Sequence, residues 1–206
     1  MDTDTTMEKH TPAHQSDSSA LGQQRLPGDL AIWVFILAEL LVFAVFFGAY
    51  VFARAGDVEL FSAEQAMLNS NLGALNTVLL VTSSFFVVRA VQLGEAGEGR
   101  RAANWLAGAI ACGAGFVVVK FSEYVAQFSQ GISLSSSTFH MFYISLTFFH
   151  FMHVLLGLVI LVALWRNARA GLYGPDNMNG LESGAAYWHM VDLVWLILFP
   201  LVYVLR

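Results

Sequence analysis

Five stretches of the chain are long and apolar enough to cross the hydrocarbon core of a bilayer, which takes about 20 helical residues. They cover approximately residues 30–53, 72–93, 104–126, 139–165 and 186–205. Each is too long to be a strand of a membrane barrel, which has about ten residues and alternates in polarity. Because isolated spans satisfy their backbone hydrogen bonds only as helices, the pattern predicts an all-α polytopic membrane protein whose five transmembrane helices form a bundle.

The composition agrees with a membrane protein. Of the 206 residues, 57% are apolar and 12% are charged, which leaves too little polar surface to coat a water-soluble globule of this size. The net charge of −5 arises largely in the N-terminal segment, because five of the fifteen acidic residues precede residue 30. The charge pattern offers no basic surface for nucleic acid. The single cysteine, Cys112, has no intrachain disulfide partner.

The N-terminal segment, residues 1–28, is rich in Asp, Thr, Ser and Gln. It lacks the basic start and the apolar core of a cleavable signal peptide. We expect a disordered polar tail here and place the transmembrane domain at residues 29–206.

The basic residues beside the spans predict the orientation in the membrane. One side receives seven of them, Lys9, Arg25, Arg89, Arg100, Arg101, Arg166 and Arg169, and the other side receives Arg54 and Arg206. An excess of Lys and Arg marks the cytoplasmic side. The N-terminus is therefore expected in the cytoplasm and the C-terminus on the periplasmic side.

Ionisable residues inside the spans need an explanation, because a charged group at the centre of a membrane helix costs roughly 2.5–3.5 kcal/mol. The residues concerned are Glu39, His150, His153, His189 and Asp192. At about 1.5 Å of rise per residue, the first three lie near the middle of the bilayer and the last two lie nearer the cytoplasmic face. We expect Glu39 to hydrogen-bond a neighbouring helix, with His150 or His153 as its partner by depth.

Three interpretations of these groups remain open. The i, i+3 spacing of His150 and His153 suits two imidazoles on one metal ion, but no third ligand stands at a recognisable spacing. A carboxyl group at the depth of Glu39 suits a role in proton transfer, although no chain of titratable groups crosses the bilayer. The interpretation that we favour is structural, with buried Glu, His and Asp side chains pairing between helices and fixing their register.

Other polar and aromatic residues fall near the ends of the spans. His189 and Asp192 suit a local contact or a polar clasp between helices. Lys120 and Glu123 are expected to form an ion pair or to extend toward the interface, with packing against a partner as the alternative. Five aromatic residues are placed as interfacial anchors would be, namely Trp33, Trp105, Trp165, Trp188 and Tyr203.

Five blocks of the sequence, in order, resemble cytochrome c oxidase subunit III, a subunit of haem-copper oxidases. They are "DLAIWVFILAELLVFAVFFGAYVFAR", "LNTVLLVTSS", "VKFSEY", "FHFMHVLLGLVILV" and "YWHMVDLVWLILFPLVY". The resemblance covers about residues 28–205. Because the blocks are co-linear, together they are more specific than any one of them alone.

The resemblance implies a supporting role. It makes Glu39 the buried membrane carboxylate of the family and makes Glu123, His150, His153, His189 and Asp192 the polar residues of the matching motifs. It implies a bacterial inner-membrane subunit that holds no haem and no metal itself, binds lipid, and supports the assembly, stability or turnover of a catalytic subunit. The haem and the copper or iron are expected in that partner.

The subtype and the function class stay open at this point. The chain starts where the third helix of longer members would start, and its short acidic tail ending in "RLPGDLAIWVF" makes it most similar to NorE-type proteins associated with nitric oxide reductase and denitrification. The alternative within the family is a genuine subunit III of an aerobic cytochrome c or quinol oxidase. Outside that role, the alternatives are a small transporter or proton channel, and an independent haem enzyme.

Overall fold

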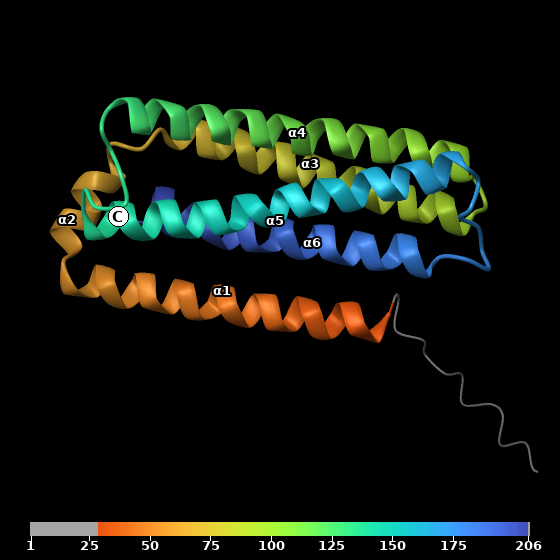
Figure 1. Ribbon diagram of the computed structural model, residues 1–206, viewed down its shortest axis with the longest axis horizontal. Coiled ribbons are helices and arrows are strands. Elements are labelled where there is room, and N and C mark those ends of the chain that lie inside the picture. Colours follow the sequence, from red (N-terminus) through yellow and green to blue (C-terminus); the bar gives the residue numbers. More distant parts are fainter. Residues whose placement is uncertain (1–28, 206) are drawn as a thin grey trace, which may run out of the picture.

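The computed structural model describes residues 29–205 and confirms the predicted all-α bundle (Figure 1). Its helices are α1 (Leu30–Gly56), α2 (Val58–Gln65), α3 (Ser70–Glu95), α4 (Gly99–Ser129), α5 (Thr138–Arg169) and α6 (Asn179–Phe199), followed by a π-helical turn, η1 (Pro200–Val204). Within the described part of the chain, five helices are long and apolar enough to cross a membrane. The expected disordered tail, residues 1–28, lies outside the described residues.

Several helices begin or end at local sequence signals. The side chain of Asp29 accepts a hydrogen bond from the backbone N–H of Ala31 and so caps α1. Asn69 and Ser137 cap α3 and α5 in the same way. After α5, Gly171 adopts a φ of 74°, a left-handed conformation that glycine reaches without steric penalty and that commonly terminates helices.

The helices extend beyond the predicted spans. The fifth, for example, starts at Asn179 rather than near residue 186, because polar residues continue a helix past the apolar core of the bilayer. The short helix α2 was not predicted, since eight residues of mixed polarity give no clear periodicity.

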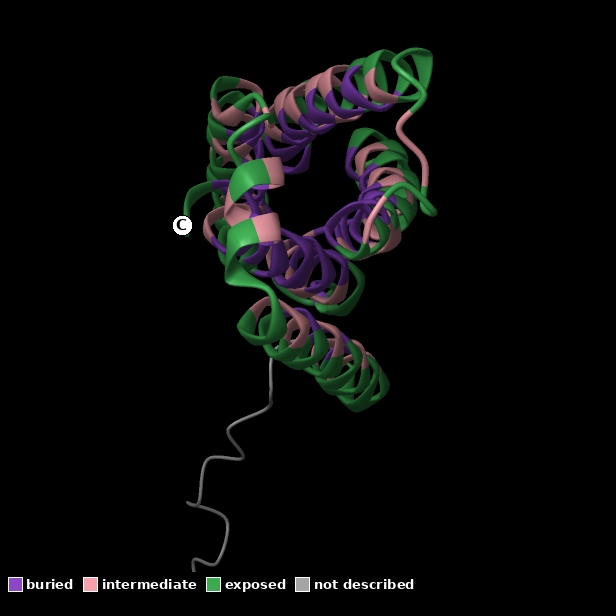
Figure 2. Ribbon diagram, turned by 90° about the vertical axis from the view of Figure 1, so that its left-hand side faces the viewer, coloured by how far each residue is buried: buried purple, intermediate pink, exposed green. Residues whose placement is uncertain are grey.

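The long helices alternate in direction, so the bundle has two ends (Figure 1). We call the end at which α1, α4 and α6 begin the N-terminal end, and the end that carries α2 and η1 the C-terminal end. α3, α4, α5 and α6 pack together, and their buried residues face one another in the end-on view of Figure 2. α1 lies to one side, against α5 and α6, with most of its surface exposed.

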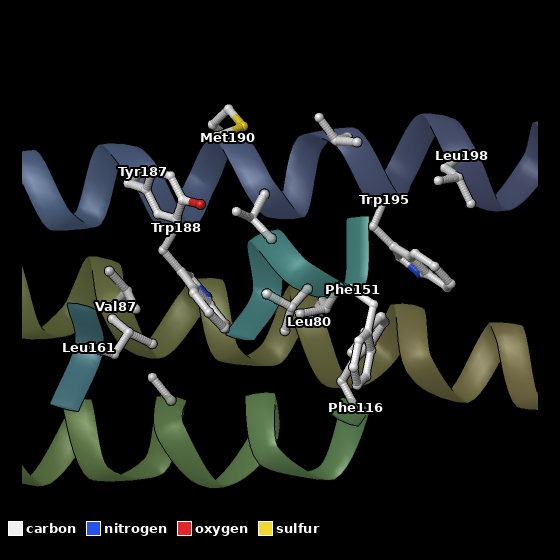
Figure 3. Packing of buried hydrophobic residues seen from close by; sticks show 14 of the residues in the cluster. Leu80, Val87, Phe116, Phe151, Leu161, Tyr187, Trp188, Met190, Trp195 and Leu198 are labelled. Atoms are coloured by element: carbon white, nitrogen blue, oxygen red, sulfur yellow. The ribbon is translucent and has the colours of Figure 1, made fainter. Parts of the chain in front are cut away.

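The core of the four packed helices is built around two tryptophans of α6. Figure 3 shows Trp188 and Trp195 pointing from α6 toward α3 and α4. A Cβ atom built on Gly113 of α4 would lie 2.9 Å from the Trp188 ring, and one on Gly157 of α5 would lie 2.7 Å from it. The indole therefore fills a slot between two glycines. The prediction that Trp188 is an interfacial anchor is wrong, because its side chain is fully buried.

Candidate functional site

Glu39 of α1 contacts His153, one of the two histidines expected at its depth in the bilayer. Its Oε2 atom lies 3.1 Å from Nε2 of His153 on α5. Both side chains are largely shielded, with 21% of Glu39 and 11% of His153 exposed. The ring of Phe43, one turn along α1, packs edge-on against His153 with centroids 5.3 Å apart. The expected hydrogen bond between helices is confirmed.

The hydrogen bond of the second ring nitrogen of His153 determines where that ring carries a hydrogen. Nδ1 lies 2.8 Å from the backbone carbonyl of Phe149, and because a carbonyl only accepts, Nδ1 must carry a hydrogen. The contact between Nε2 and Glu39 then holds one further proton, either on the carboxyl group or on the imidazole. The pair therefore joins α1 to α5 through one hydrogen bond.

His150, one turn before His153, has a different environment. It is fully buried, and neither ring nitrogen has a hydrogen-bond partner among the described residues. Aromatic rings surround it instead, with the Trp195 centroid at 5.2 Å and the Phe116 centroid at 5.8 Å. Polar pairing between helices, as expected for the buried histidines, therefore applies to His153 and not to His150.

Lys120 and Glu123 form the centre of the most extensive polar cluster in the described chain. Nζ of Lys120 lies 3.0 Å from Oε2 of Glu123. The ammonium group also donates to the hydroxyl groups of Tyr143 on α5, at 3.0 Å, and Tyr203 on η1, at 2.7 Å. Both hydroxyls donate onward to Oε1 of Glu123, each at 2.8 Å. These bonds join α4, α5 and the C-terminal turn.

The predicted ion pair is confirmed, and both of its side chains are buried inside the bundle instead of extending to its surface. The Lys120 side chain has no exposed surface, and 6% of Glu123 is exposed. The ammonium group lies within about 6 Å of four aromatic ring centroids, those of Tyr124, Tyr143, Trp195 and Tyr203. Because the rings and hydroxyls surround the charge, Lys120 does not extend to water.

Tyr203 reaches this cluster through the π-helical turn. Pro200 has no backbone N–H, so it cannot continue the α-helical hydrogen-bond ladder. The chain instead closes a wider turn in which the N–H of Leu205 donates to the carbonyl of Pro200 at 2.9 Å. Tyr203 was predicted as an interfacial anchor, and that prediction is wrong because 1% of it is exposed. The sequence analysis did not predict that Tyr143 belongs to this cluster, because the position of a residue along a span does not show which side chains it contacts.

His189 and Asp192 share a serine on the neighbouring helix. Nδ1 of His189 lies 3.2 Å from Oγ of Ser84 on α3, and the carboxylate of Asp192 interacts with the same hydroxyl. The sequence allowed either a local contact between His189 and Asp192 or a polar contact between helices. The shared serine makes the contact between α6 and α3. The two side chains also interact electrostatically with each other.

A further polar contact, at the C-terminal end, was not predicted. The carboxylate of Glu64 on α2 accepts a hydrogen bond from the Ser137 hydroxyl and lies 3.1 Å from Nδ1 of His140. It ties the short helix to the start of α5.

These groups pair mainly with one another and leave no evident metal site. Across residues 29–205, no group of three or more His, Cys, Asp and Glu side chains is arranged to hold an ion. The proposed ligand pair of His150 and His153 thus finds no third ligand there. The clusters instead connect helices: α1 with α5, α3 with α6, and α4 with α5 and η1.

The family model for cytochrome c oxidase subunit III matches residues 26–206, which is nearly the whole chain. The chain belongs to the cytochrome c oxidase subunit III family. This finding confirms the resemblance read from the five sequence blocks.

Curated relatives agree with the family and refine the subtype. The chain is 32% identical to cytochrome c oxidase subunit 3 of Thermostichus vulcanus, over 85% of this chain and 86% of the relative. It is 33% identical to a probable cytochrome c oxidase subunit 3 of Nocardia farcinica, over 84% and 85%. It is also 29% identical to quinol oxidase subunit 3 of Bacillus subtilis, over 85% and 86%. These names favour the alternative of a genuine oxidase subunit III over the NorE-type interpretation.

Proposed function

We propose that the chain is subunit III of an aerobic terminal oxidase that receives electrons from cytochrome c or from a quinol. The observation that carries the proposal is the match to relatives named subunit 3 of these two oxidase classes over at least 84% of this chain. In this proposal the chain has no catalytic centre. Haem and copper reside in the catalytic subunit, and the chain supports assembly, stability or sustained turnover of that subunit.

The position of α1 is the structural feature through which the chain supports its partner. α1 packs against the other helices less extensively than they pack together. At the level of Glu39, its attachment to α5 includes the polar bond to His153. A change at Glu39 therefore alters how α1 is presented to the partner.

The proposed location is the bacterial cytoplasmic membrane, with the N-terminal end of the bundle on the cytoplasmic side. Arg89, Arg100, Arg101, Arg166 and Arg169 lie at or near that end, as expected for positively charged cytoplasmic segments. Arg54 lies at the opposite end.

Affinity purification of the tagged chain from its native membrane in mild detergent tests the proposal. We expect an oxidase catalytic subunit to copurify and to contribute the absorption spectrum of its haems. Recovery of a nitric oxide reductase in its place, or of the chain alone from membranes that contain an oxidase, would contradict the proposal.

Two substitutions in the same assay test the role of Glu39. Glu39→Gln retains a donor for Nε2 of His153, so it should preserve recovery of the complex. Glu39→Ala leaves that buried nitrogen without a hydrogen-bond partner, which costs about 1–3 kcal/mol of stability. It should therefore lower recovery of the complex. If neither substitution changes assembly or turnover, the role assigned to the pair is wrong. Equal loss of turnover in both, with normal assembly, would instead point to proton transfer.

A further inference from the structure

A cavity of about 470 Å³ lies toward the N-terminal end of the bundle, lined by residues of α1, α3 and α6. We call it the lateral cavity. Its volume falls in the range of roughly 300–1,000 Å³ that is usual for small-molecule sites. Its lining is mainly apolar and includes the indole of Trp33, and polar side chains are contributed by Gln92, Glu182 and His189. An apolar cavity with a few polar groups suits a ligand that is itself largely apolar.

The lateral cavity reaches the surface that faces lipid acyl chains. Val88 of α3 and Leu193 of α6 line it, and 40% and 47% of these residues are exposed. Both helices are long and apolar enough to cross a membrane. An apolar molecule that enters from the bilayer can therefore leave a long hydrocarbon chain outside the cavity.

His189 presents a hydrogen-bond acceptor to the lateral cavity. Its Nδ1 atom lies 3.2 Å from Oγ of Ser84, and the same hydroxyl interacts with the carboxylate of Asp192. Because a carboxylate only accepts, the serine hydrogen is directed to Asp192, and the serine oxygen accepts from the N–H at Nδ1. The other ring nitrogen, Nε2, then carries a lone pair. It has no hydrogen-bond partner among residues 29–205, so it is left to accept from a ligand.

Gln92 presents the complementary group, a hydrogen-bond donor. Its Oε1 atom accepts from Nη1 of Arg89 at 2.8 Å, which leaves the amide nitrogen to donate. Gln92 lies eight residues from Ser84, the partner of His189, and this spacing corresponds to about 12 Å along α3. The acceptor and the donor are therefore separated by a space that accommodates a six-membered ring with an oxygen atom at each end.

We propose that the lateral cavity binds the ring of an isoprenoid quinol. One hydroxyl group of the quinol donates to Nε2 of His189, and the oxygen of the other accepts from the Gln92 amide. The Trp33 indole and the aliphatic side chains contact the ring, and the isoprenoid chain extends into the bilayer. An oxidised quinone has no hydroxyl hydrogen to donate to Nε2, and a lipid acyl chain uses neither polar group. The site therefore selects the reduced form.

Binding of a quinol to this chain goes beyond the proposed function. It assigns a ligand to this subunit whether the oxidase takes its electrons from cytochrome c or from a quinol. It involves no electron transfer within the chain. Copurification of an oxidase tests the proposed function separately, so each of the two proposals can fail while the other stands.

The test uses the purified full-length chain in mild detergent under anaerobic conditions, with binding of decylubiquinol measured by isothermal titration calorimetry. The dimethyl ether of this quinol keeps the ring and the chain but lacks both hydroxyl hydrogens, so it should bind about tenfold more weakly. His189→Leu should weaken quinol binding by a similar factor and leave binding of the ether unchanged. Excess phosphatidylcholine, which has no hydroxyl donor, should not displace the quinol.

Two alanine substitutions separate the cavity from general effects on the bundle. Ala186→Phe fills the lateral cavity while it retains His189 and Gln92, so it should abolish quinol binding. Ala111→Phe adds the same side chain to the exposed surface of α4, outside the cavity, and should bind the quinol like the wild type.

Five results would each overturn the proposal. They are equal affinities for the quinol and its ether, wild-type quinol binding by His189→Leu, retained binding by Ala186→Phe, equal losses in the two phenylalanine variants, and displacement of the quinol by phosphatidylcholine. If His189→Leu does not fold, the comparison of quinol with ether and the phenylalanine pair still decide the outcome.

Discussion

Lys120 shows how a single buried charge is held in an apolar bundle. Its ammonium group is bonded to one carboxylate and two phenols, and it has no exposed surface. Lys120→Met should therefore leave Glu123 as an unpaired buried charge and destabilise the protein by about 3–5 kcal/mol. Thermal unfolding of the detergent-solubilised chain measures the loss.

The double variant of the same pair distinguishes charge from packing. Lys120→Met with Glu123→Gln leaves no unpaired charge and keeps an acceptor for the hydroxyls of Tyr143 and Tyr203. It should recover much of the stability that Lys120→Met loses. A double variant as unstable as the single one would show that the lysine acts through its volume and not through its charge.

Contacts between residues were predicted correctly where the depth of two residues in the bilayer was enough to pair them. Glu39 and His153 lie at similar depths on oppositely directed helices, and that was enough to pair them. Depth did not reveal that His150 faces aromatic rings, because the rotation of a helix about its axis depends on packing with its neighbours. It also did not reveal that Lys120 is buried, since the tyrosines around it come from α5 and the C-terminal turn.

At the level of helices, the slot for Trp188 determines how closely α4, α5 and α6 approach. Gly157→Ala would place a Cβ atom 2.7 Å from the buried ring, and Gly113 limits its movement on the other side. We expect this substitution to destabilise the chain by about 1–3 kcal/mol, as overpacking of a core does. The midpoint of thermal unfolding measures the change.

Gly48 provides the matched control for this substitution. A Cβ atom built there has no neighbour within 4 Å, although the residue also lies within a membrane-spanning helix. Gly48→Ala should therefore leave stability unchanged or raise it slightly, because alanine favours helix more than glycine does. Equal effects of the two substitutions would rule out the slot as the cause.

The number of membrane-spanning helices was predictable, whereas the ends of the helices were predicted less well. Long apolar runs report the thickness of the bilayer core, so all five spans appear where the sequence placed them. They do not report polar extensions, which explains the early start of α6 at Asn179. They also do not report the wide turn at Pro200, since a proline near a helix end is compatible with several terminations.

At the level of the whole molecule, five of the six arginines in residues 29–205 lie at or near the N-terminal end, and this asymmetry predicts the orientation in the membrane. In a Cys112→Ala background, a cysteine in place of Ser135, in the loop between α4 and α5, should react with a membrane-impermeant maleimide added to intact cells with a permeabilised outer membrane. A cysteine in place of Asp176, in the loop between α5 and α6, should react only after the inner membrane is opened. The two loops lie at opposite ends of the bundle, so the reverse pattern would invert the proposed orientation and labelling of both sites in intact cells would contradict a single orientation.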